Sequence, residues 1–535
     1  MKKTLKYLAS FGVYLLVFGH FLLPLFLGEP ICIAAEQPSI LRVGMPGEPE
    51  NLAPNDCVDL NGLLVIFHTH ERLVTVDPKM NISPQLATSW ELTADAIIFH
   101  LRKGVRFHDG APFNAKAVKV SFDRIMTEKL KAISKISGYF KSAEIIDDNT
   151  VKIHVLGPPS VALIAFSIFG YIESPMAIEK YDRKDLSRRP IGTGPFKFVE
   201  WVSDQRVVLE VNKDYWGGEP KISQIFFKPV RDPQTRLSML EAGDLDIMVN
   251  PDVTELNRLE SNPRLKVLSQ VCGLTVYLVF NVAKKPFDDK RVREAFSCAI
   301  DREAIVKTLL FGHIKPVKYY VAPEVKYAVE YNTYSYDPEK AKSIFGELGW
   351  KVGKSGYLEK DGEVFKAAIM SPTGRYPMDI QIAEAVQAQL KKVGIDLKVL
   401  SAESATFVKY LMSDVEAKQK AEFGISIVQI YSGPDVGVAL RASLHSNSMA
   451  PKGMNTGMFS NREFEETLDE ANRASNETER GKLLKKAQDI VDRELPFLPI
   501  YSWTYFIALR KDVTGVVIPN GYNCLYITKD AKIER

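Results

Sequence analysis

The hydrophobic positions along the chain follow two different periods, one typical of strands and one typical of helices. Residues 206–211 alternate between apolar and polar side chains, as a half-buried strand requires. Residues 196–201 are rich in aromatic and β-branched side chains, and residues 203–205 between the two runs have turn chemistry. The pattern therefore predicts a β-hairpin, and residues 41–45 predict another short strand.

Helical spacing recurs in other segments of the chain. Val118, Phe122 and Ile125 stand three or four residues apart, which gives a helix one buried face, and Asn114 is placed as its N-cap. The same spacing recurs over residues 292–299. We therefore expect amphipathic helices in both places.

Capping residues predict where further helices begin and end. Asp301 and Asp337 are placed as N-caps, and Pro338 follows the second one at the first helical position. Gly243 and Gly312 stand where two helices are expected to stop.

Between residues 365 and 400 the order strand, helix, strand is predicted, which is typical of an α/β unit. The chain has 535 residues, too many for one core, so about three domain-sized units are expected. The alternation of both periods along this length predicts an α/β protein.

The N-terminus resembles an export signal. Three lysines (Lys2, Lys3 and Lys6) precede an uncharged run over residues 7–28, and small residues follow it. We expect residues 1–35 to be a signal peptide cleaved after Ala34 or Ala35. An uncleaved membrane anchor is the alternative, because the apolar run is long for a signal.

Charge and cysteine content narrow the function further. The formal charge of +3 falls to about +1 without residues 1–35, so no electrostatic reason favours nucleic acid. Cys57, Cys272, Cys298 and Cys524 remain after export, and none lies in a CxxC pair that would indicate zinc. The sequence does not determine which of these cysteines form disulfides. Cys298 lies on the apolar side of its predicted helix, so we expect it to be buried.

The sequence contains no strong metal-binding or catalytic motif. His68, His70 and Glu71 suggest a metal site at first, since both histidines would share a face on a strand, but no third ligand of comparable spacing follows. A structural role is favoured. No nucleophile, base and metal set is assembled anywhere, so we expect a binding protein without catalytic residues, metal or cofactor.

The segment 189–218, RPIGTGPFKFVEWVSDQRVVLEVNKDYWGG, carries a family resemblance. Its GTGPFKFVEW and VLEVNKDYWGG motifs are similar to the hallmark of the bacterial peptide- and nickel-type solute-binding proteins, the ligand-capturing components of ABC importers. Residues 86–91, 100–115, 277–312 and 336–350 match the same family. The resemblance therefore covers nearly the whole mature chain.

This resemblance implies an α/β fold of the two-lobed periplasmic-binding-protein type (type II, cluster C-like), with an inserted domain and a cleft that closes about a hinge. The implied bounds are 40–83, 191–270 and 505–535 for lobe I, 84–190 for the inserted domain and 271–504 for lobe II. It implies a periplasmic monomer that captures a small solute, above all a di- or oligopeptide, and delivers it to a membrane permease.

The resemblance also implies candidate ligand contacts. Arg375, in the loop SPTGRYPMD, matches an arginine that can bind a ligand carboxylate. Asp435 is expected to pair with a peptide's α-amino group. Without a gap, however, the acid's place in the family pattern falls on Gly433, and only a small shift brings Asp435 there.

Asn455, Tyr431 and Glu71 complete the expected ligand-binding set. Asn455 lies in a region that matches a family pattern, although Met458 and Phe459 replace the usual Gly-Tyr there, and a loop-capping role is its alternative. Other functions stay open: a binding protein for a nickel chelate or another solute, a sensory binding protein, or a secreted peptidase.

Overall fold

The computed structural model describes most of the chain from residue 39 onward. The described residues are 39–77, 81–132, 136, 138–323, 325–331, 335–431, 435–474, 476–519 and 525–534. From Ser39 the chain forms one compact unit. The expected signal peptide, together with Gly433 and Cys524, lies outside the described residues.

A ten-stranded mixed sheet runs through this unit. Its strands, in spatial order, are β17 (Asp396–Glu403), β16 (Lys366–Thr373), β18 (Ile425–Tyr431), β12 (Leu265–Phe280), β19 (Phe497–Arg510), β11 (Ile247–Val249), β1 (Ile40–Met45), β10 (Gln224–Pro229), β9 (Arg206–Val211) and β8 (Phe196–Val202). The predicted hairpin is confirmed, because β8 and β9 pair antiparallel at the end of the sheet.

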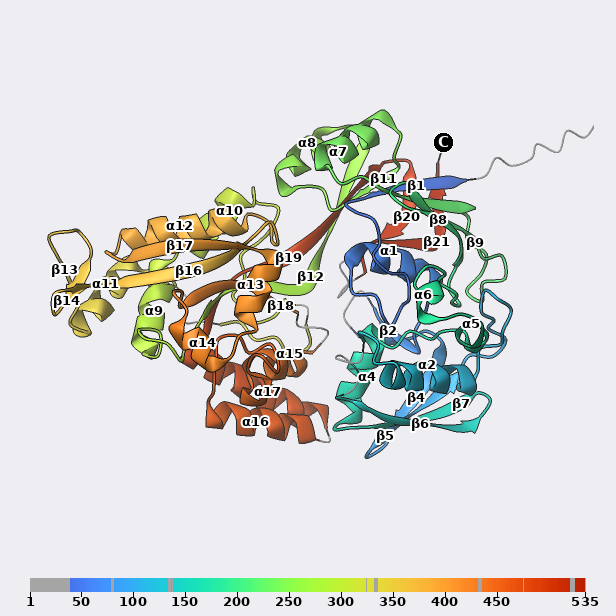
Figure 1. Cartoon of the computed structure of the whole chain (residues 1–535), viewed down its shortest axis with the longest axis horizontal. Coiled ribbons are helices and arrows are strands. Elements are labelled where there is room, and N and C mark those ends of the chain that lie inside the picture. Colours follow the sequence, from blue (N-terminus) through green and yellow to red (C-terminus); the bar gives the residue numbers. More distant parts are fainter. Residues whose placement is uncertain are drawn as a thin grey trace, which may run out of the picture. The chain divides into compact units, whose positions relative to one another are not determined.

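Two long strands, β12 and β19, connect the two halves of this sheet (Figure 1). They pair antiparallel, and their register shifts between Val271 and Thr275. Such a shift leaves residues unpaired and bends the strand. The predicted boundaries between the lobes fall at the same place in the ladder, where Val271 faces Thr504. The division into lobes itself stays a prediction.

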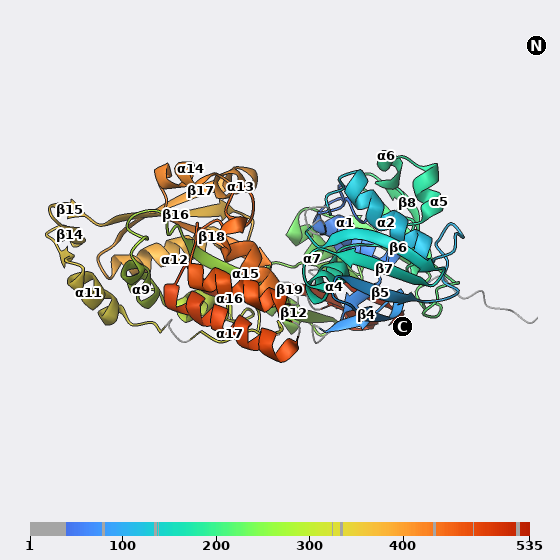
Figure 2. The ribbon, with the colours of Figure 1, turned by 90° about the horizontal axis from the view of Figure 1, so that it is seen from below.

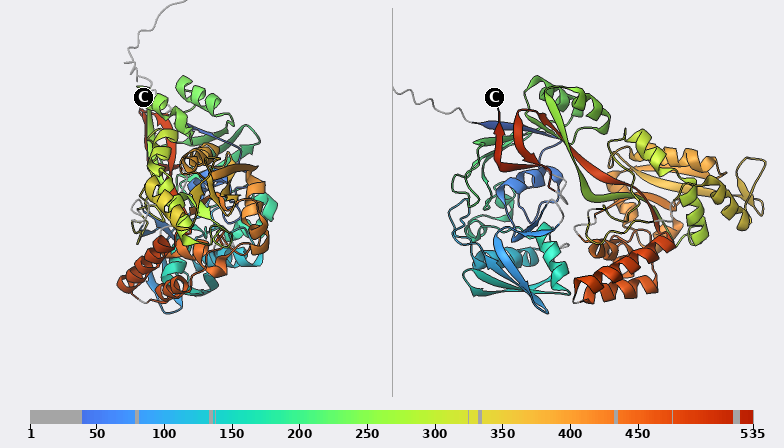
Figure 3. Two further views of the ribbon diagram at one scale, coloured as in Figure 1. Left: turned by 90° about the vertical axis from the view of Figure 1, so that its left-hand side faces the viewer. Right: turned by 180° about the vertical axis from the view of Figure 1, so that it is seen from behind.

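A second sheet has four antiparallel strands. Their order is β4 (Ala87–Leu92), β5 (Ala96–Leu101), β7 (Thr150–Val155) and β6 (Phe140–Asp147). Helix α2 (Ala115–Thr127) packs on one face of this sheet, and Figure 3 shows the sheet from behind. Asn114 caps α2, and Val118, Phe122 and Ile125 are fully buried, as predicted. These residues belong to a separate hydrophobic core within residues 73–172.

The predicted strand–helix–strand unit is also confirmed. Strands β16 and β17 pair in parallel, and the helix between them, α12 (Asp379–Lys391), packs on both (Figure 2). Ile382, Val386 and Leu390 of α12 are buried against the sheet side of the core. The chain is therefore an α/β protein, as its patterning predicts.

The remaining elements surround the two larger sheets. The helices are α1 (Leu60–Thr69), α4 (Pro159–Ile168), α5 (Pro175–Lys180), α6 (Arg183–Leu186), α7 (Pro233–Ala242), α8 (Leu256–Ser261), α9 (Lys290–Ala299), α10 (Arg302–Leu309), α11 (Pro338–Glu347), α13 (Ser404–Leu411), α14 (Val415–Lys420), α15 (Val436–Leu444), α16 (Arg462–Arg473) and α17 (Glu477–Glu494), with 3-10 turns η1 (Val253–Glu255) and η2 (Ser446–Ser448). The short strands are β2 (Val74–Val76), β3 (Ile82–Pro84), β13 (Lys351–Val352), β14 (Leu358–Lys360), β15 (Glu363–Val364), β20 (Val513–Val517) and β21 (Tyr526–Ile533).

Most predicted helix ends are correct. The carboxylates of Asp301 and Asp337 cap α10 and α11, and Gly243 closes α7 in a left-handed conformation. The prediction that α10 runs to Gly312 is wrong, because the helix already ends at Leu309. Gly312, at φ 78°, lies in the turn that follows.

The glycine-rich loop before β8 lies against the C-terminal end of α1. A Cβ atom at Gly192 would lie 2.1 Å from the carbonyl oxygen of Thr69 and 2.7 Å from the ring of His70. A Cβ atom at Gly194 would lie 2.7 Å from the carbonyl oxygen of His68. Two backbones therefore meet so closely here that only glycine fits.

Candidate functional site

Glu71 follows α1 and is held by the aromatic corner at the end of the hallmark segment. Its carboxylate accepts hydrogen bonds from the Thr193 hydroxyl (2.8 Å), the Tyr215 hydroxyl (3.0 Å) and the Trp216 indole (2.7 Å). Burial raises the pKa of Glu71 to about 7, although these bonds and the nearby Arg102 act in the opposite direction. These contacts give the carboxylate a structural role, and the predicted ligand role stays untested.

The histidines around α1 have structural contacts. His68 lies in the last turn of α1 and His70 is its C-cap, so the two histidines do not share the face of a strand. The Nδ1 atom of His68 contacts the Leu64 carbonyl (2.8 Å), and its Nε2 accepts from the Ile527 amide (2.9 Å). Burial lowers the pKa of His68 to about 4 and that of His70 to about 3.

Arg375 stands in the loop between β16 and α12. The buried carboxylate of Asp379 fixes this loop by accepting the backbone amides of Arg375 (2.9 Å), Tyr376 (3.2 Å) and Gly374 (3.4 Å). The exposed guanidinium donates to the hydroxyls of Ser404 (2.6 Å) and Tyr376 (3.2 Å). Within the described residues its partners are thus two neutral hydroxyls, which orient the cation without neutralising it.

Tyr376 links this loop to the strand β19. Its ring makes an edge contact with Trp503, at 6.4 Å between centroids. Trp503 in turn lines a small pocket together with Leu60 and Leu64 of α1. The Tyr376 hydroxyl also accepts a hydrogen bond from the backbone amide of Gln429 (3.2 Å). The side-chain amide nitrogen of Gln429 is buried and has no hydrogen-bond partner among the described residues. The Arg375 cation therefore lies beside the ring of Tyr376, which in turn contacts Trp503.

Asp435 is 1% exposed and forms an ion pair with Arg480. Its oxygens accept from the Arg480 guanidinium at 2.6 and 2.8 Å, and one of them also accepts the amides of Gly437 (2.9 Å) and Val438 (3.3 Å) as the N-cap of α15. The carboxylate thus has a structural role that sequence reasoning did not predict. Its expected contact with a ligand amine stays untested.

Asn455 has the contacts of a loop-capping residue. Its amide nitrogen donates to the carbonyls of Leu444 (3.1 Å), His445 (3.3 Å) and Phe459 (2.7 Å), and its oxygen accepts the amide of Phe459 (3.0 Å). The side chain is fully buried. Tyr431 ends β18, but its side chain lies outside the described part of the structure. Ligand contacts by both residues stay predictions.

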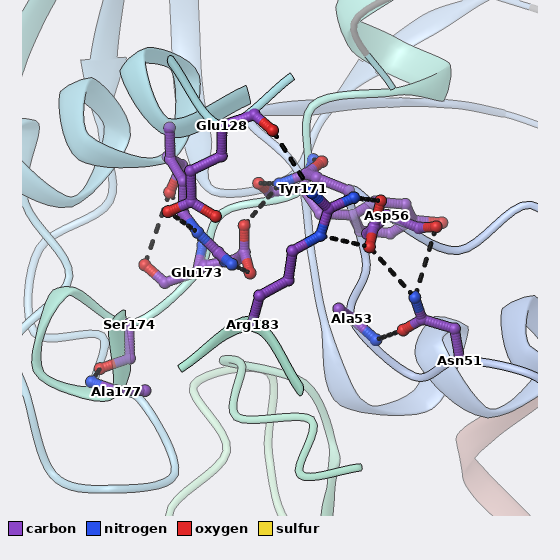
Figure 4. A network of polar contacts seen from close by, with 12 residues as sticks. Asn51, Ala53, Asp56, Glu128, Tyr171, Glu173, Ser174, Ala177 and Arg183 are labelled. Carbon is purple, nitrogen blue, oxygen red and sulfur yellow. Dashed lines mark hydrogen bonds and ion pairs between the residues drawn. The ribbon is translucent and has the colours of Figure 1, made fainter. Parts of the chain in front are cut away.

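A network of polar contacts joins the segment before α1 to α2, to α6 and to Glu173 (Figure 4). The amide of Asn55 donates to Glu173 (2.9 Å), whose carboxylate also accepts from Arg124 (2.7 Å). Arg183 donates twice to Asp56, at 2.7 and 2.9 Å. The charged side chains are paired, so the network fixes the loop 51–57 against the domain beside it.

The described ranges, which begin at residue 39, contain no group of three or more His, Cys, Asp or Glu side chains that could hold a metal ion. Cys57, Cys272 and Cys298 are buried free thiols. In the same ranges, no helix has both the length and the hydropathy needed to cross a bilayer.

Comparison with known proteins shows the family. The family described as "Bacterial extracellular solute-binding proteins, family 5 Middle" matches residues 81–450, more than half of the chain. The chain belongs to this family. Its members are periplasmic or extracellular solute-binding components of ABC transporters and not enzymes. The predicted family, and the function of a solute-binding component that works with a membrane permease, are therefore confirmed.

Individual relatives agree with this assignment. The glutathione-binding protein GsiB of Escherichia coli K12 is 30% identical over 496 residues, which cover 90% of this chain and 92% of GsiB. The oligopeptide-binding protein AppA of Bacillus subtilis, solved with a nonapeptide, is similar with a TM-score of 0.71 at 25% identity, over 90% of this chain and 97% of AppA.

NikZ of Campylobacter jejuni, solved with Ni(L-His), has a TM-score of 0.74 at 24% identity, over 90% of this chain and 96% of NikZ. This likeness shows a shared fold. Together these structures confirm the predicted type II periplasmic-binding-protein fold.

Sequence reasoning found the Arg375 loop but missed its supports. Ser404 and Gln429 are distant in sequence and carry no motif, so only the folded sheet places them there. Trp503 was missed as well, because the sequence does not show that it is half-buried within a strand of mostly buried residues.

Proposed function

We propose that this solute-binding protein captures a short peptide by its ends and that Arg375 binds the peptide's carboxylate. The observation that carries the proposal is the exposed guanidinium, oriented by two hydroxyls and unneutralised by any described carboxylate. A guanidinium matches a carboxylate with two parallel hydrogen bonds. The relatives named glutathione-binding protein and oligopeptide-binding protein favour a peptide-like ligand.

The amino end of the peptide is assigned to Asp435, whose carboxylate would then be shared between the ligand and Arg480. Gln429 offers its buried amide nitrogen to a peptide carbonyl. Tyr431 and Asn455 are secondary candidates for ligand contacts. Glu71 is a further candidate, although its carboxylate already accepts three hydrogen bonds.

Capture is proposed to occur by closure of lobe II on lobe I about the register shift in β12. Bending at an irregular point of a two-strand connection costs little, because few backbone hydrogen bonds are lost there. The ligand drives closure only through its greater affinity for the closed state. The mature protein is proposed to be a periplasmic monomer, cleaved near Ala34 or Ala35, that releases its ligand unchanged and binds no nucleic acid.

Calorimetric titration tests this function with four probes: Ala-Ala-Ala, its C-terminal amide, its N-acetyl form and Ni(II) with L-histidine. The free tripeptide should bind most tightly, and loss of its carboxylate should weaken binding by about two to four decades. Mass spectrometry should recover the tripeptide intact. If only the nickel complex binds, the ligand is a metal chelate and not a peptide. If the tripeptide is cleaved, the protein is an enzyme.

A further inference from the structure

We propose that a pocket beside α1 is a subsite for an apolar side chain of the bound peptide. The inference rests on the proposed peptide-binding function and names the ligand's side-chain chemistry. The pocket has a volume of about 250 Å³ and is formed by α1, by the segment 54–58 and by the turn after α4.

The lining of this pocket is mostly apolar. Leu63 and Phe67 from α1 face Ile168 and Phe169 from the end of α4. Cys57 contributes a thiol that donates to Asp59, and burial raises its pKa, so it remains neutral. An apolar ligand side chain is stabilised when such a surface removes it from water, whereas a charged side chain would lose its hydration there.

The pocket wall is preformed and stiff. The buried guanidinium of Arg72 lies between the rings of Phe67 and Tyr171, at 5.1 and 4.8 Å from their centroids, and donates to the Tyr171 hydroxyl (3.0 Å). Asn55 bonds to both the carbonyl (2.9 Å) and the amide (3.1 Å) of Tyr171. The network of Figure 4 fixes Asn55 in turn. A ligand side chain would therefore enter without prior rearrangement of the wall.

The pocket shares helix α1 with the pocket that contains Trp503, whose ring contacts Tyr376 next to Arg375. Leu60 and Leu64 of α1 line the pocket that contains Trp503, whereas Leu63 and Phe67 line the pocket proposed here. Residues three or four apart on a helix are neighbours, about 5–6 Å between Cβ atoms, so the two pockets occupy adjacent ridges of one helix. A peptide anchored near Trp503 can thus place a side chain in the second pocket.

Two apolar side chains next to this pocket are also exposed to solvent. Val58 is 61% exposed and Leu60 is 56% exposed, at the start of α1. Exposed apolar surface beside a preformed pocket is typical of a ligand site.

The volume limits the size of the occupant. A cavity of about 150 Å³ lined by Leu, Ile and Phe holds benzene, so this pocket accommodates a leucine or phenylalanine side chain. Most of its lining is apolar, so a lysine or arginine side chain would lose hydration there without a matching gain. The expected ligand is therefore a peptide with one bulky apolar residue.

Calorimetric titration of the full-length protein tests the subsite. The probes are Ala-Ala-Ala and the tripeptides with one leucine or one lysine at position 1, 2 or 3. Each buried methylene raises affinity roughly fourfold, so leucine at one of the positions should raise affinity at least tenfold over alanine. Lysine at that position should not.

Two matched variants separate the pocket from the rest of the site. Val58→Asp places a carboxylate at the pocket mouth and should remove the leucine advantage while leaving the affinity for Ala-Ala-Ala within about threefold. Val352→Asp changes a valine of similar exposure (65%) in β13 and should leave both affinities unchanged.

The outcomes distinguish the two proposals. If Ala-Ala-Ala and its leucine forms bind equally, or Val58→Asp weakens all of them equally, the subsite is overturned and peptide binding stands. If no tripeptide binds, the proposed function fails and the subsite fails with it. A leucine advantage that disappears only in Val58→Asp supports both.

Discussion

The carboxylate of Asp435 and the guanidinium of Arg480 form a buried ion pair, with hydrogen bonds of 2.6 and 2.8 Å. Both side chains are almost completely buried, at 1% and 4% exposure. The pair ties the N-terminus of α15 to α17, across 45 residues of sequence. Asp435 therefore contributes to the stability of the fold whether or not it also contacts a ligand.

This relationship gives the first prediction. Asp435→Asn leaves Arg480 buried without its counter-charge, which should lower the free energy of unfolding by about 3–5 kcal/mol in urea denaturation. The control is Glu466→Gln, which breaks an exposed pair with Arg462 and should cost less than about 1 kcal/mol. A variant as stable as the parent would mean that the pair carries no stability.

Glu71 predicts a dependence of stability on pH. Its pKa is raised to about 7 from an ordinary 4.5, so the folded state holds a proton more tightly than the unfolded chain. This contribution to stability is complete below pH 4.5 and is lost as the pH rises through 7. Between pH 4.5 and 8, Glu71→Gln should therefore gain about 3 kcal/mol of unfolding free energy relative to the parent.

Urea denaturation of the parent and of Glu71→Gln at pH 4.5 and pH 8 measures this difference. Glu179→Gln, at an exposed position, serves as the control and should show no such change. An equal effect of Glu71→Gln at both pH values would contradict a raised pKa.

His68 predicts that the protein also loses stability when the pH falls, the opposite direction to the effect of Glu71. Its pKa is depressed to about 4 from 6.5, because the ring is buried and its Nε2 accepts the Ile527 amide. The stability it contributes is present above pH 6.5 and is lost as the pH falls through 4. As the pH falls through this range, the parent should lose about 3 kcal/mol of unfolding free energy through His68. In urea denaturation, the unfolding free energy of His68→Gln should fall correspondingly less. Parallel pH curves would overturn this.

The glycine-rich loop gives a steric prediction. A methyl group at Gly192 would lie 2.1 Å from the Thr69 carbonyl oxygen, so Gly192→Ala should destabilise the protein by about 1–3 kcal/mol. Gly346→Ala is the matched control, because Gly346 lies in α11 with nothing within 4 Å of an added Cβ. That control should stabilise the helix by about 1 kcal/mol, as thermal or urea unfolding would show.

Local patterning predicted much of the fold. The alternation around 206–211, the spacing of Val118, Phe122 and Ile125, and the caps at Asp301 and Asp337 all describe interactions within a few residues. The order of the ten strands was not predictable from such patterns, because β19 pairs with β12 across more than 200 residues. One helix end at Gly312 was wrong, because a glycine marks a turn but not the residue at which the helix ends.

The candidate site was predicted less well than the fold. Arg375 was visible because glycine and proline mark its loop. The partners of Glu71 and Asp435 were not visible, since Trp216 and Arg480 reach them only through tertiary packing. A charged residue in a family motif can equally be a structural ion pair, and the sequence alone does not separate the two roles.

The central claim is that Arg375 binds a peptide carboxylate, and a thermodynamic cycle tests it most directly. Calorimetry would measure Ala-Ala-Ala and its C-terminal amide against the parent and against Arg375→Ala. In the parent, the free acid should bind at least a hundredfold more tightly than the amide. In Arg375→Ala the two should bind alike, with an unchanged thermal midpoint for the free protein, because the side chain is exposed. An equal preference for the free acid in both proteins would contradict the claim.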